Sequence, residues 1–278
     1  MWAGVGGRWS GRHAEPHSVA ARRRAIVPAL PHHGDMAGLL QVAVCDESDA
    51  RRAAEGGADR LLVVGEWRDQ GYSPEPRMVA RLTRQVDLPA RPLLRLRAGF
   101  RTDGGEVTRL VGLIASYLDS GAEGMVLGFL DGYLQPDVEV IQALIADGGW
   151  PWSFDRAIDH CLQQDAAWRI VAGQPNLDGI ITAGSPEGVE RGLDTLIARA
   201  RKDPWARQVM VVGGGLAPEH VAWLSRAGVR AFQLDTQVRP GGDWSAPVDA
   251  DLVRSWRMLV DDAVRHAEAG ISGRLAQR

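Results

Sequence analysis

The sequence contains almost no lysine, little cysteine and no long apolar run. It has 278 residues and 32 basic side chains, of which Lys202 is the only lysine. Its formal net charge of −3 gives no sign of the basic surface that nucleic-acid binding requires. No apolar stretch approaches the roughly 20 residues that span a bilayer. We therefore expect neither a nucleic-acid partner nor association with a membrane.

The two cysteines, Cys45 and Cys161, are too few for a disulfide framework in a chain of this length. Free thiols are typical of a reducing compartment, because disulfides form mainly in secreted and extracellular proteins. The expected localisation is therefore cytoplasmic.

The first 36 residues show neither helical nor strand periodicity. They hold four of the seven histidines, without the regular spacing of metal ligands, and Pro28 and Pro31 interrupt their one apolar patch. A secretory signal would need a continuous apolar core of about 7–15 residues. We expect residues 1–36 to be a disordered extension, or the product of a misassigned start with Met36 as the true first residue. Residues 37–270 should form one barrel domain, followed by a C-terminal tail at 271–278.

A helix that ends at glycine and leads into a short apolar strand recurs along the chain. Glycine readily takes the left-handed conformation that ends a helix, and the chain can then turn into a buried parallel strand. The clearest examples are Gly56-Gly57-Ala58-Asp59 before Arg60–Val64, Gly121-Ala122-Glu123 before Gly124–Leu127, and Gly228-Val229-Arg230 before Ala231–Leu234.

Eight such strands can be assigned, separated by amphipathic segments of helical length. They are Leu39–Val44, Arg60–Val64, Ala90–Arg95, Gly124–Leu127, Trp152–Asp155, Gly179–Thr182, Val209–Val212 and Ala231–Leu234. This alternation over about 235 residues is typical of a closed (β/α)₈ barrel, the TIM barrel. An open doubly wound sheet is the alternative, but no glycine-rich dinucleotide fingerprint follows the first strand. We predict an α/β fold of the TIM-barrel type, whose last helix ends at Gly270.

In a TIM barrel, the loops after the strands build the functional site at the mouth formed by the C-terminal strand ends. Polar and glycine residues occupy these positions in several of the predicted units. The candidate ligand-binding residues are Gln41, Arg95, Arg97, Arg156, Thr182, Gly184, Gly213, Gly214, Gly215 and Gln233. Asp155 is the acid–base candidate, and neighbouring arginines should favour its charged form. Cys45 is expected nearest the mouth on the first strand.

Arginines that converge with glycine-rich loops and helix N-termini predict a site for a small anionic ligand. Guanidinium groups bind carboxylate or phosphate through paired hydrogen bonds, and backbone N–H groups in such loops favour negative charge. The alternative is structural, because Arg95 and Arg156 could pair with Asp155, Asp159 or Asp103 and hold the rim together. The sequence leaves both interpretations open.

Other chemistries lack the residues they need. A Schiff-base aldolase needs a lysine at the mouth, whereas Lys202 precedes the seventh strand, at the opposite end. A zinc hydrolase needs clustered histidines and carboxylates, and no predicted strand ends in histidine. His160 and Cys161 could form a reactive pair, but adjacent positions on a helix diverge by about 100°. We expect these two residues to lie on a helix surface.

The region from Leu39 to about Asp235 resembles the CutC family, copper-homeostasis proteins built on a (β/α)₈ barrel. The resemblance implies the same fold, a cytoplasmic role in copper homeostasis and copper ion binding. It is carried, in matching order, by Gly57-Ala58-Asp59-Arg60, Gly71-Tyr72-Ser73-Pro74, Pro92-Leu93-Leu94-Arg95-Leu96-Arg97, Ser153-Phe154-Asp155-Arg156-Ala157-Ile158-Asp159, Ile181-Thr182-Ala183-Gly184 and Gly213-Gly214-Gly215.

The chain also departs from the family pattern, mostly at polar positions. The family has glutamate in place of Gln41 and Leu62, cysteine near Ala43 and often in place of Val64, and histidine in place of Asp155 and Gln233. The family's arginines and glycine loops are kept. Cu(I) prefers soft thiolate and thioether ligands, and Cys45 is the best remaining candidate. The resemblance therefore implies a divergent member with copper as its possible metal.

Three functions stay open at this point. The first is copper homeostasis, with Cys45 as a ligand. The second is an enzyme or former enzyme that acts on a small phosphorylated or carboxylated metabolite. The third is a structural or regulatory barrel whose mouth is plugged by apolar side chains such as Leu62 and Val64. Abundant tryptophan is expected to pack in the barrel or, alternatively, to form a homodimer interface.

Overall fold

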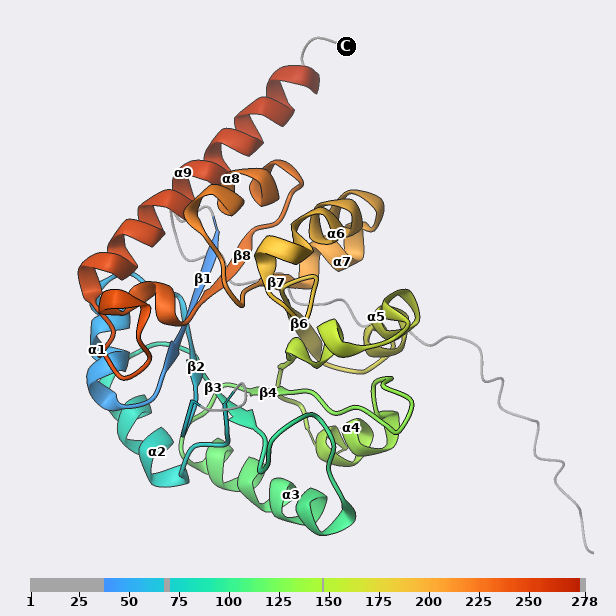
Figure 1. The fold of residues 1–278 in the computed structure, drawn as a ribbon. Helices are drawn as coiled ribbons and strands as arrows, with labels where there is room; N and C mark the ends of the chain where they lie inside the picture. The colour runs from blue at the N-terminus through green and yellow to red at the C-terminus, as the bar shows by residue number, and fades with distance from the viewer. Residues whose placement is uncertain (1–37, 68–70, 147, 276–278) are drawn as a thin grey trace, which may run out of the picture.

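The computed structural model describes residues 38–67, 71–146 and 148–275, with the side chains of 270–275 excepted. The expected N-terminal extension, residues 1–36, lies outside the described residues. Eight parallel strands close into a barrel in sequence order, and helices surround it on the outside (Figure 1). The predicted TIM barrel is therefore confirmed.

The strands lie where the apolar runs placed them, with small differences at their ends. They are β1 (Leu39–Val44), β2 (Arg60–Val63), β3 (Ala90–Leu94), β4 (Met125–Leu127), β5 (Trp152–Phe154), β6 (Leu177–Thr182), β7 (Met210–Val212) and β8 (Ala231–Leu234). The largest difference is at β6, which begins two residues before the predicted Gly179. Asp178 concealed this start, because a charged residue favours a loop, yet here it pairs with a charge inside the barrel.

The described helices follow the strands in the expected alternation. They are α1 (Glu47–Glu55), α2 (Pro76–Gln85), α3 (Gly104–Asp119), α4 (Val138–Ile145), α5 (Gln164–Ala172), α6 (Val189–Lys202), α7 (Pro204–Val209), α8 (Pro218–Arg226) and α9 (Ala250–Leu275), with 3₁₀ turns η1 (Arg156–His160), η2 (Thr236–Val238) and η3 (Pro240–Gly242). The expected end of the last helix at Gly270 is wrong. A helix tolerates an internal glycine at a cost of about 1 kcal/mol, and α9 continues to Leu275.

The turns that lead into the strands use glycine as predicted. Gly57, Gly121 and Gly228 have φ angles of 92°, 87° and 95°, in the left-handed region that side chains disfavour. Each follows a helix and precedes a strand, so these residues set the direction in which the chain enters the barrel.

The barrel interior has an apolar layer toward the mouth and a charged layer toward the N-terminal strand ends. The apolar layer is made by Ala43, Leu62, Val64, Leu93, Val126, Ile181, Val211 and Ala231. In the charged layer, the buried Arg91 donates two hydrogen bonds of 2.6 Å to Asp178 and one of 2.7 Å to Glu123. Arg91 also donates to the hydroxyl of Ser153 at 2.9 Å. One guanidinium thus ties together β3, β5, β6 and the turn that leads into β4.

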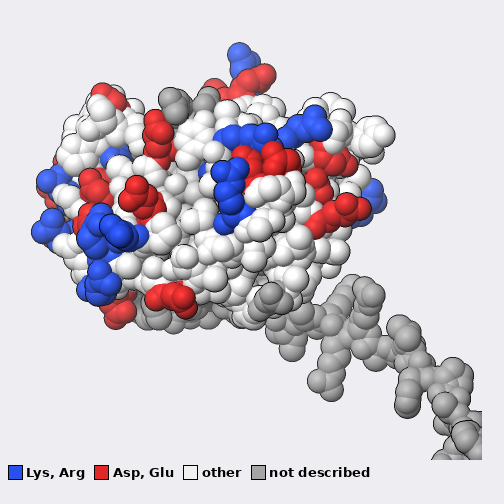
Figure 2. All heavy atoms as spheres, turned by 90° about the horizontal axis from the view of Figure 1, so that it is seen from below, with Lys and Arg blue, Asp and Glu red and all other residues white. Residues whose placement is uncertain are grey.

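The described outer surface carries charges of both signs. On the side shown in Figure 2, basic and acidic side chains are interspersed. Among the described residues, no helix combines the length and apolar character needed to cross a membrane.

Arg91→Met should destabilise the protein by up to roughly 3–5 kcal/mol, because the mostly buried Asp178 loses its two short hydrogen bonds and keeps only the longer contact with Arg60, at 4.0 Å. Urea unfolding measures this difference. The double variant Arg91→Met/Asp178→Leu should recover part of the loss, since Glu123 is more exposed and can reach water. Arg51→Met, at an exposed position on α1, is the matched control. A loss below 1 kcal/mol in Arg91→Met would contradict the role given to this layer.

Candidate functional site

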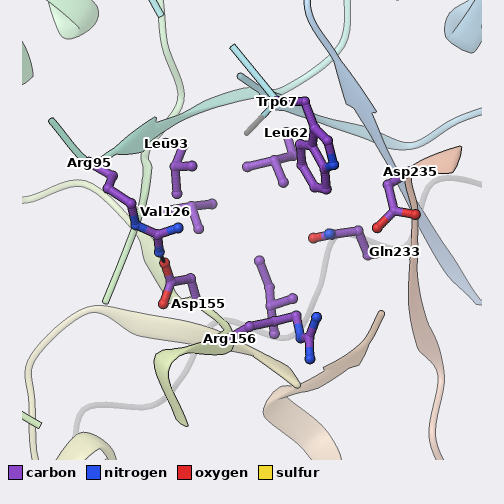
Figure 3. A pocket seen from close by; sticks show the side chains of 10 residues that line it. Leu62, Trp67, Leu93, Arg95, Val126, Asp155, Arg156, Gln233 and Asp235 are labelled. Carbon is purple, nitrogen blue, oxygen red and sulfur yellow. Dashed lines mark hydrogen bonds and ion pairs between the residues drawn. The ribbon is translucent and has the colours of Figure 1, made fainter. Parts of the chain in front are cut away.

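A pocket opens at the C-terminal ends of the strands, where the sequence predicted the site. It has an empty volume of about 440 Å³, its opening to solvent included. Its lining residues are Leu62, Trp67, Leu93, Arg95, Val126, Asp155, Arg156, Ile181, Gln233 and Asp235 (Figure 3). Four of these, Leu62, Leu93, Val126 and Ile181, belong to the apolar layer of the barrel and form an apolar floor. Of the two apolar residues named by the plugged-barrel hypothesis, Leu62 belongs to this floor, whereas Val64 is buried in the same layer and is not among the lining residues.

Arg95 and Asp155 form a buried ion pair on one wall. Arg95 Nη2 donates to Asp155 Oδ2, and the backbone N–H of Ala157 donates to Asp155 Oδ1 at 2.8 Å. The ring of Phe100 lies 4.7 Å from the Arg95 guanidinium. Burial raises the pKa of Asp155, while Arg95 acts in the opposite direction. The arginines favour the charged form, as predicted, but they do not set the pKa, because removal of the carboxylate from water is the larger effect.

Arg156 is held at the pocket edge by Asp159 and by the loop after β6. Its Nε donates to Asp159 Oδ2 at 3.1 Å. Its Nη2 donates to the carbonyl oxygens of Ser185 and Pro186 at 3.1 and 3.0 Å. Among the described residues, its Nη1 has no hydrogen-bond partner. One nitrogen of a partly exposed cation therefore stays available to a ligand.

Thr182 and Gly184, two predicted ligand-binding residues, contact Asp159 instead of lining the pocket. The Thr182 hydroxyl donates to Asp159 Oδ1 at 2.6 Å, and the Gly184 N–H donates to the same oxygen at 3.1 Å. The Ala183 N–H donates to Asp159 Oδ2 at 2.8 Å. These donors fix the carboxylate that orients Arg156, so both residues support the pocket indirectly.

Two of the three glycines after β7, Gly213 and Gly214, pack against site residues, and none of the three is among the lining residues. A side chain at Gly214 would begin within 2.8 Å of the Arg156 guanidinium, and its φ of 87° also favours glycine. A side chain at Gly213 would begin 2.8 Å from Gln233 Cβ. Nothing within 4 Å would meet a Cβ at Gly215, whose φ is 78°. Gly213 and Gly214 thus leave room for two lining side chains.

Arg97 does not share a face with Arg95. Strand β3 ends at Leu94, so the alternation of side chains stops before Arg97. Arg97 is exposed and donates to Asp103 at 2.9 Å, with its Nε 2.8 Å from a Glu106 oxygen. It lies outside the set of pocket-lining residues.

Gln41 lies beneath the pocket and contacts one of its lining residues. Its side-chain amide donates to Gln233 Oε1 at 2.7 Å, and both side chains are buried. Gln233 lines the pocket and points toward its centre in Figure 3.

Besides the apolar floor, two lining residues, Trp67 and Asp235, were not among the ligand-binding residues predicted from the sequence. Trp67 follows β2 and stacks on Trp244, with ring centroids 4.0 Å apart, and Trp244 in turn packs under the Arg239 guanidinium at 4.1 Å. Asp235 follows β8, and burial raises its pKa. Their positions directly after strands were the available signal. From the abundance of tryptophan we expected these side chains to pack inside the barrel fold, and the buried Trp152 and Trp256 do so.

The surroundings of Cys45 fit Cu(I) poorly. Cys45, Asp46 and Asp49 form a cluster whose potential ligand atoms lie within 4.8 Å of one another. The Cys45 thiol donates to Asp49 Oδ2 at 3.2 Å, and burial together with Asp49 raises its pKa to about 12. Asp49 Oδ2 also accepts from Arg239 at 2.7 Å. Cu(I) prefers several soft sulfur ligands, whereas this cluster offers one protonated thiol and hard carboxylates.

The second thiol cannot complete a site with Cys45. Cys161 is buried after β5, on the far side of the ring from β1, and its thiol contacts the Ala157 carbonyl at 3.6 Å. Burial raises the pKa of Cys161 to about 12. The neighbouring His160 faces the Phe100 ring, with centroids 4.7 Å apart. As a copper ligand, Cys45 stays a prediction, and neither Cys45 nor Cys161 lines the pocket.

Comparisons with known proteins agree with this architecture. The CutC family model matches residues 39–237. A family protein CutC from Klebsiella pneumoniae subsp. pneumoniae is 27% identical over 231 residues, which cover 78% of this chain and 92% of that protein. One from Xanthomonas campestris pv. campestris is 30% identical over 204 residues, covering 72% and 83% respectively.

A solved structure has the same fold. The crystal structure of CutC from Streptococcus agalactiae matches with a TM-score of 0.63 and 20% identity, over 70% of this chain and 97% of that one. The matched family region begins at β1 and extends just past β8, so it contains all eight strands and every pocket-lining residue. The chain therefore belongs to the CutC family.

Proposed function

We propose that this chain binds a small organic anion in the mouth pocket, and that the pocket is its functional site. One observation carries the proposal: two hydrogen-bond donors, Arg156 and Gln233, line a pocket with an apolar floor. The two side chains come from β8 and from the turn after β5, so they approach a ligand from different strands. A mostly apolar pocket with a few convergent polar groups is typical of small-molecule sites.

The charges of the pocket limit the charge of the ligand. Among the lining residues, two arginines stand beside two aspartates, and Arg95 is already paired with Asp155. A polyanion such as a bisphosphate would find no surplus of positive charge. The balance favours a ligand with a single acidic group, bound at Arg156, and an apolar or ring-shaped body that packs on the floor and against Trp67.

Acid–base chemistry in this pocket would fall to Asp155. It lines the pocket, it is buried, and its pKa is raised, so it is suited to exchange a proton nearer neutral pH than an ordinary aspartate. Its two oxygens are hydrogen-bonded to Arg95 and Ala157. A ligand would therefore have to displace or share one of these donors, and binding without catalysis needs no such step.

The CutC family is associated with copper homeostasis, as the description of the Streptococcus agalactiae protein also indicates. For this chain we propose that any part in copper homeostasis does not depend on a copper centre at Cys45. The single thiol, its raised pKa and the pairing of Asp49 with Arg239 support this view.

Arg156→Gln should abolish the stabilisation of the protein by small carboxylates, because it removes the cation that faces them. Thermal-shift assays with the carboxylates pyruvate, lactate and benzoate measure this effect, and glycerol 3-phosphate tests whether a phosphate monoester behaves in the same way. Loss of a charged hydrogen bond worth about 1.5–3 kcal/mol predicts roughly 10- to 100-fold weaker binding. Arg97→Ala, outside the pocket, is the matched control and should respond like the wild type. The proposal fails if no probe stabilises the wild type, or if Arg156→Gln responds equally.

Cys45→Ser should leave Cu(I) binding unchanged in competition with a chromophoric Cu(I) chelator. Neither protein is expected to retain a stoichiometric equivalent of copper at chelator concentrations that strip isolated thiols. Stoichiometric binding by the wild type that disappears in Cys45→Ser would show instead that Cys45 is a copper ligand. Cys161→Ser serves as the control for loss of a thiol elsewhere in the barrel.

A further inference from the structure

A chain of hydrogen bonds runs from the charged layer of the barrel to the pocket. Arg60 Nε donates to Gln41 Oε1 at 2.6 Å, and Gln41 Nε2 donates to Gln233 Oε1 at 2.7 Å. The three residues are register partners on adjacent strands: Gln41 pairs with Arg60 on β2 and with Gln233 on β8. All three side chains are buried, with at most 3% of each residue exposed. The first member lies among the ionic groups, and the last lines the pocket.

The chemistry of Arg60 fixes the direction of each hydrogen bond in this series. A guanidinium has five N–H donors and no acceptor, so the Gln41 atom that it contacts has to be the oxygen. Burial lowers the pKa of Arg60 to about 10, which leaves it charged at neutral pH. The nitrogen of Gln41 must therefore face Gln233, and the Gln233 atom that it contacts must be the oxygen.

The remaining polar atom of Gln233 is then its amide nitrogen. Within the described part of the chain, no hydrogen-bond acceptor contacts this nitrogen. A reversed Gln233 would place two N–H donors against each other beneath the pocket, and an unsatisfied buried donor costs about 1–3 kcal/mol. The amide of Gln233 is thus held in one orientation by a residue two strands away.

We propose that Arg60 and Gln41 are positioning residues, which present the N–H group of Gln233 to the pocket and so select ligands by an acceptor oxygen. This inference rests on the proposed function, that the pocket binds a small molecule. It names the class of group that contacts Gln233: a carboxylate or carbonyl oxygen binds there, and an ammonium or amidinium group is rejected. Gln233 and Arg156 together then supply donors to the same acidic group.

Benzoate and benzamidinium are suitable probes, because they have nearly the same shape and opposite hydrogen-bonding character. In NMR titrations of the full chain, benzoate should bind the wild type at least 10-fold more tightly than benzamidinium does. Gln41→Glu should reduce this preference at least 10-fold, which corresponds to about 1.4 kcal/mol. A carboxylate at position 41 still accepts from Arg60 but can only accept from Gln233, so the Gln233 amide turns its oxygen to the pocket.

The matched control is Gln208→Glu, which makes the same change of charge at an exposed position on α7, before β7 and away from the mouth. It should leave both affinities unchanged. A second measurement separates reorientation from simple charge repulsion: the exchange of the Gln233 side-chain amide protons with water. Their ¹⁵N-resolved signals, identified by their absence in Gln233→Glu, should exchange quickly in the wild type and at least 10-fold more slowly in Gln41→Glu.

Equal preference in the wild type and Gln41→Glu, or unchanged amide exchange, would overturn the inference. If neither probe binds the wild type, that result counts against the proposed function. The amide-exchange measurement needs no ligand, and it then decides alone whether Arg60 and Gln41 orient Gln233.

Discussion

Eight parallel strands that close on themselves create an interior that has to be filled, and this chain fills the N-terminal half with paired charges. Arg91 satisfies two carboxylates and a hydroxyl from three directions. Removal of any buried partner leaves an uncompensated charge, so the layer specifies which strands are neighbours as well as stabilising them. The apolar floor of the pocket lies directly on this layer, and the polar chain through Gln41 begins beside it.

Most of the fold could be predicted from the sequence because two simple signals repeat. Short apolar runs mark buried parallel strands, and glycines such as Gly57 mark the turns that lead into them. The errors occurred where a local rule was overridden by a distant partner. Asp178 favours a loop until Arg91 is placed opposite it.

The site was predictable in position but not in pairing. The rule that strand ends converge placed Arg95, Asp155 and Arg156 together, and they do line one pocket. The rule does not predict that Arg95, and not Arg156, forms the buried ion pair with Asp155. Nor does it predict that the loop after β6 orients Arg156 through Asp159. Arg97 was misplaced because the alternation of side chains was extended past the end of the strand, and β3 already ends at Leu94.

The aromatic wall of the pocket, formed by Trp67, is supported by residues from a different part of the sequence. Trp67 belongs to the region that matches the family model, whereas Trp244 and Arg239, which support it, follow the last matched residue at 237. Trp67 therefore lies inside the region that matches the family, and the two residues that support it lie outside that region. The two supporting residues differ in what else they contact. Arg239 also donates to the Ala43 carbonyl of β1 and to Asp49, whereas Trp244 stacks on Trp67 from outside the strands. A substitution at Trp244 can therefore reshape the entrance while the hydrogen bonds of β1 stay in place.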